Sequence, residues 1–187
     1  MDQRRTDTRA QLQSVALQLF AENGYDATSL REIAERLAIT KAAVYYHFRS
    51  KDEILASLIE DFLGHLDELL RWGSSQPPGS ATRVEVLRRY SSLLDGPTAQ
   101  LARFVREGPS AIRDPALRTR IGDCYRGLFD LLGPPGPSVE GRLRARVALS
   151  SLHIGTTGDQ PHAGEPRHRA AALAIAVEVL LPRDGST

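Results

Sequence analysis

The sequence predicts an all-α fold in which a small three-helix unit precedes a longer helical bundle. Apolar residues recur at intervals of three and four along the chain, and no segment shows the alternating pattern of a strand. Clusters of glycine and proline, such as residues 73–80 and 133–137, separate these apolar segments as breaks between helices. Three helix-start signals also lie within the short stretch 29–51, which predicts two short helices and the start of a third.

Composition limits the classes of protein to which the chain can belong. Its 187 residues suit one small domain and one larger one, and 41% hydrophobic residues are enough for a core. The net charge of +1 excludes a broad basic surface, but the only two lysines, Lys41 and Lys51, both lie in or beside the stretch with the helix-start signals. The single cysteine, Cys124, and the polar N-terminus without a signal peptide predict a protein of the reducing cytoplasm.

The helix-start signals have the residue types of N-caps. Ser29 is followed three residues later by Glu32, and Ser50 by Glu53, as in a capping box, where the two residues satisfy each other's backbone N–H groups. Thr40 is suited to cap a helix that begins at residue 41. The sequence therefore predicts helices that begin near residues 30, 41 and 51.

A helix further upstream completes the three-helix unit. Its apolar stripe consists of Leu12, Val15, Ala16, Leu19 and Phe20. Gly24 follows where a left-handed C-terminal cap is expected. A second apolar stripe consists of Leu30, Ile33, Ala34 and Leu37. Only Ala38 and Ile39 separate it from Thr40, so the chain must turn sharply there. A short third helix rich in hydroxyl, basic and aromatic side chains after such a turn is typical of a helix-turn-helix that binds DNA.

Residues from about 8 to 55 resemble the DNA-binding domain of the TetR family of bacterial transcriptional regulators. The resemblance rests on the segments ALQLF (16–20), NGY (23–25), TSLREIA (28–34), TKAAVYYHF (40–48) and SKDEIL (50–55). Ala42 and Ala43 depart from the Gly and Thr of many relatives, which affects base preference more than the assignment. The resemblance implies a DNA-binding domain over 6–65, with the recognition helix at about 40–47, and a helical ligand-binding and dimerisation domain over 66–187.

The implied function is a ligand-responsive regulator that acts in the cytoplasm at the nucleoid. It is expected to repress by binding a palindromic operator as a homodimer and to be released by a small apolar or amphipathic inducer. A ligand-independent regulator and an activator of the same fold remain alternatives that the sequence does not separate from it.

Contacts to DNA are expected at the start of the recognition helix and at both ends of the unit. Base contacts fit Lys41, through its ammonium donor, and the methyl groups of Ala42 and Ala43. Phosphate contacts fit Tyr46, His47 and Lys51. The full expected set is Thr28, Ser29, Thr40, Lys41, Ala42, Ala43, Tyr45, Tyr46, His47 and Lys51.

The rest of the chain is expected to form further helices over about 51–71, 81–94, 98–107, 115–132, 139–154 and 166–181. In the last two, Val139, Leu143, Val147 and Ile154 form one stripe, and residues 170–181 are apolar nearly all round. The family resemblance assigns this pair to a four-helix dimer interface, with burial in the chain's own core as the alternative. The interface residues expected are Leu143, Val147, Ile154, Leu173, Val177 and Leu180.

An effector pocket is expected among the aromatic and apolar residues of the bundle, although ordinary core packing is an alternative for each of them. The candidates are Phe62, Leu66, Trp72, Tyr90, Phe104, Cys124, Tyr125, Phe129 and His153. The sequence contains no recognisable catalytic constellation, so an enzyme is not expected, and neither is a cofactor. No metal site is expected either, because the histidines lack metal-ligand spacing and His162 and His168 only flank a loop.

Overall fold

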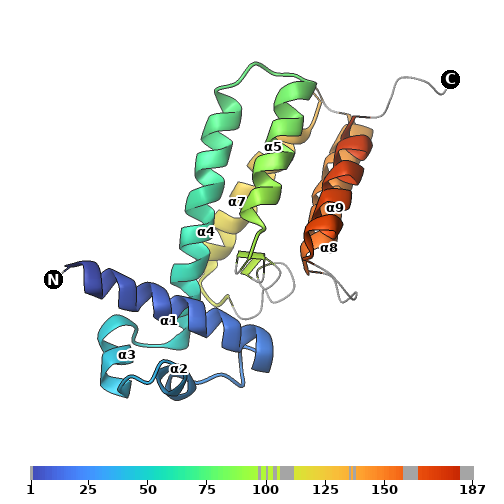
Figure 1. Ribbon diagram of the computed structural model, residues 1–187. Coiled ribbons are helices and arrows are strands. Elements are labelled where there is room, and N and C mark those ends of the chain that lie inside the picture. Colours follow the sequence, from blue (N-terminus) through green and yellow to red (C-terminus); the bar gives the residue numbers. More distant parts are fainter. Residues whose placement is uncertain are drawn as a thin grey trace.

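The computed structural model describes residues 2–96, 98–99, 101–102, 105, 112–134, 136, 138–157 and 164–181, with side chains from residue 7 onward. Every element in these ranges is a helix, which confirms the all-α prediction. Three helices form one end of the molecule, and a long fourth helix leads from them into a bundle of the remaining helices (Figure 1).

The three-helix head consists of α1 (Asp2–Asn23), α2 (Leu30–Arg36) and α3 (Lys41–His47). Its core contains most of the predicted stripe of α1, with Leu12 and Phe20 buried against Ile33 of α2 and Val44 of α3. Gly24 ends α1 at φ 87°, and its N–H donates to the Phe20 carbonyl, as a left-handed cap requires.

Helix α4 (Lys51–Ser74) continues three residues beyond the predicted end at Arg71. Leu55, Ile59, Phe62, Leu66 and Leu69 are buried as predicted, while Leu58 is only half-buried. The domain boundary predicted between residues 65 and 66 lies inside this helix, so α4 belongs to both the head and the bundle.

Helices α5 (Ser80–Leu93) and α7 (Pro115–Leu132) pack along the distal part of α4 (Figure 1). Asp114 caps α7 through the N–H of Ala116, as the Asp-Pro pair predicts. The sequence places Val84, Leu87, Ser91 and Leu94 on one face of α5. Leu87 and Leu94 are fully buried as predicted, whereas Val84 and Ser91 are half-buried, and Val86 and Tyr90 are also buried. The helix predicted over 98–107 lies largely outside the described residues, of which 98–99, 101–102 and 105 are helical.

The last two helices, α8 (Val139–Thr157) and α9 (Pro166–Leu180), form an antiparallel pair. Arg144 near the start of α8 donates to the carbonyl of Val179 near the end of α9, at 3.0 Å. At the other end of the pair, a Cβ atom added at Gly155 would lie 2.3 Å from the Cβ of Ala172. Gly155 therefore lets the two helix backbones approach closely.

We expect Gly155→Ala to lower the free energy of unfolding by about 1–3 kcal/mol, because the added methyl group overpacks the contact with Ala172. Gly122→Ala is the matched control, since its added Cβ meets no atom within 4 Å and replaces a mid-helix glycine of α7. The control is expected to be neutral or to stabilise by up to about 1 kcal/mol. Urea unfolding measures both, and a Gly155→Ala variant as stable as the wild type would contradict the close approach.

Candidate nucleic-acid interface and ligand cavity

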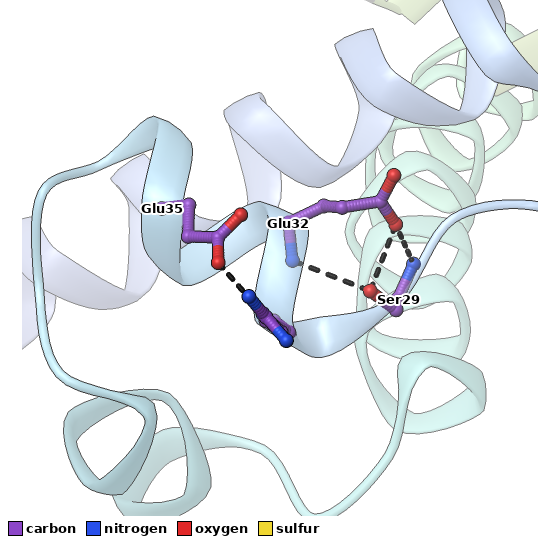
Figure 2. A network of polar contacts seen from close by, with 4 residues as sticks. Ser29, Glu32 and Glu35 are labelled. Carbon is purple, nitrogen blue, oxygen red and sulfur yellow. Dashed lines mark hydrogen bonds and ion pairs between the residues drawn. The ribbon is translucent and has the colours of Figure 1, made fainter.

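The start of α2 is fixed by the complete capping box that the sequence predicts. The Glu32 N–H donates to the Ser29 hydroxyl oxygen at 3.3 Å, and the Ser29 N–H donates to the Glu32 carboxylate at 2.7 Å (Figure 2). The Ser29 hydroxyl also donates to the Glu32 carboxylate at 2.8 Å; this bond and the bond from the Ser29 N–H lower the pKa of Glu32, because they favour its charged form. One turn further, Arg31 donates to Glu35 at 2.7 Å along the exposed side of the helix (Figure 2).

The turn between α2 and α3 is tight and holds one residue in the left-handed region. Ala38 has φ 52°, and the following residue donates its N–H to the carbonyl of Ala34 at 3.1 Å. The Thr40 hydroxyl then caps α3 by accepting from the Ala43 N–H at 3.2 Å. This confirms the Thr40 cap and sets the direction in which α3 leaves the turn.

Helix α3 turns its polar and aromatic side chains outward. Tyr45 and Tyr46 are 48% and 69% exposed, whereas Val44 is fully buried. Lys41 and Ala42 are exposed at the first turn, and the Lys41 ammonium lies 5.5 Å from the centre of the Tyr45 ring. The helix is held from behind by Phe48, which is buried beneath the guanidinium of Arg9.

The residues expected to contact DNA differ in how far they are exposed to solvent. Ser29, Thr40, Lys41 and Ala42 are exposed, and Ala43 and His47 are half-buried. Thr28 differs from the expectation, because its side chain is 2% exposed and its hydroxyl donates to the Gly24 carbonyl at 2.8 Å. Its hydroxyl is therefore turned into the head and away from any phosphate.

Lys51 also lies differently from the expected phosphate contact. Its ammonium donates to the carbonyls of Tyr25 at 2.7 Å, Asp26 at 3.0 Å and Thr28 at 3.2 Å. An ammonium has three N–H donors, so these acceptors use all of them. In this position Lys51 ties the start of α4 to the loop between α1 and α2.

Tyr25 and Asp52 reinforce the same junction. The Tyr25 hydroxyl donates to the Asp52 carboxylate, and the Lys51 ammonium lies 4.5 Å from the centre of the Tyr25 ring. Burial, together with this hydrogen bond, raises the pKa of Tyr25 well above its usual value. The second predicted capping box is only half formed here: Ser50 caps Glu53, but the Glu53 carboxylate accepts from the N–H of Arg49.

We expect Lys51→Met to lower the free energy of unfolding by about 1–2 kcal/mol, because three carbonyls lose a charged donor. The other lysine supplies the control: Lys41 is exposed on α3, so Lys41→Met should change stability by less than about 0.5 kcal/mol. Urea unfolding of the two variants measures the difference. Equal stabilities would contradict the junction role of Lys51.

A cavity of about 390 Å³ lies in the bundle between α7 and α8. Its lining includes Tyr125, Phe129 and His153, three of the expected pocket residues. Five further lining residues were not among the expected ones: Val105, Ile121, Arg146, Leu149 and Ser150. A signal for them was present, because residues 146, 149, 150 and 153 share one face of a helix.

Polar side chains from three helices meet beside this cavity. Tyr90 of α5 and His153 of α8 share a hydrogen bond of 2.7 Å between the phenol oxygen and Nε2. The Tyr125 hydroxyl of α7 lies 3.4 Å from that of Tyr90. Tyr90 and His153 are both buried, so the expected pocket residue Tyr90 supports the cavity wall from behind.

The other expected pocket residues lie outside the lining. Phe62 and Leu66 are buried in the core on α4, and Trp72 stacks with the Arg89 guanidinium, 3.6 Å from the ring centre. Cys124 faces α4, where its thiol donates to the Asp67 carboxylate at 3.3 Å. Phe104 lies outside the described residues.

Cys124 has the properties of a structural cysteine. Burial and the hydrogen bond to Asp67 raise the pKa of its thiol to about 11, because both disfavour the thiolate. Arg120 donates to the other oxygen of Asp67 at 2.9 Å and lowers the pKa of that carboxyl. The three residues form a polar link between α4 and α7.

Alkylation of Cys124 by iodoacetamide is expected to rise with pH toward a midpoint near pH 11 in the folded protein, because only the thiolate reacts. At pH 8 the thiolate fraction should be about a hundred-fold below that of a thiol with an ordinary pKa. Mass spectrometry of pulse-labelled protein measures the profile, with urea-unfolded protein as the control. A native midpoint below pH 9 would contradict the link to Asp67.

A stripe of apolar side chains is exposed along α8 and α9. Its members, 50–64% exposed, are Val139, Leu143, Val147, Ile154 and Ile175. The alternative of burial in the chain's own core therefore does not account for them. Among the other expected interface residues, Leu173 and Val177 are half-buried, and Leu180 is 4% exposed and packs inside the chain.

The described ranges contain no group of three or more histidine, cysteine or acidic side chains placed to hold a metal ion. None of the helices in the same ranges combines the length and apolar character needed to cross a bilayer.

A family model and a curated relative both match the N-terminal part of the chain. The family model described as bacterial regulatory proteins, tetR family, matches residues 12–58. The HTH-type transcriptional regulator AcrR of Shigella flexneri is 33% identical over 78 residues, which are 42% of this chain and 36% of that protein. The chain therefore matches only about a third of the length of this relative.

Solved structures extend the likeness to the whole fold. AmtR of Mycobacterium smegmatis superposes with a TM-score of 0.75 at 22% identity, over 95% of this chain and 87% of that one. SCO3833 of Streptomyces coelicolor A3, a TetR-family member, superposes with a TM-score of 0.66 at 27% identity, over 90% and 89%. The arrangement of head and bundle is thus shared over nearly the full chain.

Proposed function

Because this chain belongs to the TetR family of bacterial regulatory proteins, we propose that it is a ligand-responsive transcriptional regulator. It binds a palindromic operator as a homodimer, acts in the cytoplasm at the nucleoid, and is released from DNA by a small effector. Repression is the form of regulation that we propose, since several relatives are named as repressors.

The observation that carries the proposal is the exposed face of α3 on a rigid support. A capped turn precedes the helix, and a buried Val44 and Phe48 hold it from behind. The outward side presents a lysine, small methyl groups and two tyrosines, which suit base edges and phosphates in a major groove.

Roles within the head follow from this geometry. Lys41, Ala42, Ala43 and Tyr45 are proposed to meet base edges, because they lie on the first turns of α3. Tyr46 and His47 are proposed to contact phosphates, together with Ser29 and Thr40 at the two cap positions. Thr28 and Lys51 keep the structural roles described above and support the surface from inside.

The exposed stripe on α8 and α9 supports a homodimer. A run of large apolar side chains more than half exposed marks a surface that another protein covers. A two-fold dimer also suits the head, because one short helix contacts only a few base pairs and two helices contact successive major grooves. Leu143, Val147 and Ile154 are the proposed centre of the interface.

Ligand response is supported by the cavity beside α7 and α8. Its volume of about 390 Å³ and its apolar walls with a few polar groups are typical of small-molecule sites. A ligand regulates only if it prefers the state that does not bind DNA. A constitutive regulator of the same fold is the alternative, and the cavity favours the ligand-responsive form.

The experiment that tests DNA binding is selection of binding fragments from genomic DNA, followed by footprinting at fixed salt. We expect a protected palindrome whose half-sites are about one helical turn or somewhat more apart. Lys41→Met should weaken binding to that site by about 1–3 kcal/mol and affect random DNA less. Failure of selection to enrich any sequence would overturn the DNA-binding proposal.

We expect Leu143→Glu to shift the protein from dimer to monomer, because it places a carboxylate in the centre of the apolar stripe. Sedimentation velocity measures the change, and operator binding should weaken with it. Thr119→Glu on α7 is the control, since it adds the same charge at an exposed position away from the stripe. A Leu143→Glu variant that remains dimeric would show that the interface lies elsewhere.

A further inference from the structure

The cavity, which we call the slot, has two ends along α8 that differ in chemistry. On α8, Arg146 and His153 lie seven residues apart on one face, which corresponds to about 10 Å along the helix axis. The antiparallel wall from α7 pairs with them: Phe129 lies 5.4 Å from the Arg146 guanidinium, and the Tyr125 ring centre lies 6.4 Å from that of His153. Leu149 and Ser150 lie between the two ends on α8.

Among the described residues that line the cavity, Arg146 carries the one permanent charge, and it is exposed at the solvent edge. The described lining holds no aspartate or glutamate, and no described acidic residue forms an ion pair with Arg146. A bound anion gains an opposite charge there, whereas a bound cation meets only repulsion.

The other end offers hydrogen bonds in an apolar setting. His153 is 6% exposed, and its Nε2 is occupied by the phenol of Tyr90, so that its ring orientation is fixed. The hydroxyl of Tyr125 stands beside this pair on the cavity wall. Tyr125 is therefore the lining group best placed to exchange a hydrogen bond with an oxygen on a ligand. Ile121 and Leu149 add apolar surface to the lining that a ligand can contact.

The geometry points to an elongated organic acid as the effector: its carboxylate lies at Arg146, its apolar body crosses Phe129 and Leu149, and a hydroxyl or carbonyl oxygen reaches Tyr125. This ligand class rests on the ligand-responsive function proposed above and narrows it. The positive charge of Arg146 disfavours amines relative to acids. At about 390 Å³ the slot also favours a small acid over a bulky conjugate.

Four octyl compounds of matched length test the two ends separately: octanoate, ω-hydroxyoctanoate, octanol and octylamine. Isothermal titration calorimetry of the full-length protein gives each dissociation constant. We expect octanoate to bind about three-fold more tightly than octanol and about ten-fold more tightly than octylamine, since Arg146 is only partly shielded from water. ω-Hydroxyoctanoate should bind more tightly than octanoate.

Two substitutions assign these preferences to residues. Arg146→Gln should bring the affinity for octanoate down to that for octanol and leave octanol binding unchanged. Tyr125→Phe should abolish only the advantage of ω-hydroxyoctanoate over octanoate. Arg126→Gln is the control, because Arg126 is exposed on α7, pairs with Asp123 at 2.7 Å and lies outside the lining.

The proposal is overturned if none of the four compounds binds, if octanoate binds no better than octanol, or if its preference survives in Arg146→Gln. Operator affinity, measured with and without the bound acid, separates this proposal from the regulatory one. Tight binding of octanoate with no effect on operator affinity would contradict ligand-responsive regulation and leave the ligand class intact.

Discussion

The rest of the structure depends on the continuity of α4. Its first turn is fastened to the head by Lys51, whose ammonium donates to three carbonyls of the loop after α1, and by the bond between Tyr25 and Asp52. Its middle residues, such as Ile59, are buried in the same core as the head. Since the helix then runs unbroken to Ser74, the head and the start of the bundle share one rigid element.

The distal part of α4 meets the helix that forms one wall of the cavity. Asp67 accepts from both Arg120 and Cys124 of α7, and the next turns of α7 carry Tyr125 and Phe129 into the slot. Under the proposed function, a ligand that displaced α7 would act on α4 through this polar link, and α4 would transmit the movement to the head. Coupling of this kind requires that the ligand interact differently with the two positions of α7.

Local signals in the sequence predicted the head more fully than the bundle. Caps at Ser29 and Thr40, the glycine at residue 24 and the helical stripe of α1 depend on neighbours within a few residues, so the sequence shows them directly. The hydrogen bonds of Lys51 are not visible in the sequence, because their acceptors lie 23–26 residues away and come close only after folding. Three of the eight residues that line the cavity, Tyr125, Phe129 and His153, were among the expected pocket residues because they are aromatic. The positions of Arg146 and Ser150 beside them depend on how α8 packs against α7.

A dimer that contacts successive major grooves must hold its two copies of α3 about one turn of DNA apart. Double electron–electron resonance tests this with a spin label at Ala42→Cys in a Cys124→Ser background, since Ala42 is exposed and Cys124 is the only native cysteine. Because the label lies in the proposed DNA-contact surface, the protein is measured free of DNA and effector, where we expect one narrow distance distribution centred near 34–36 Å, allowing for the label arms. Absence of dipolar coupling, or a distance far from one turn of DNA, would contradict the dimeric arrangement.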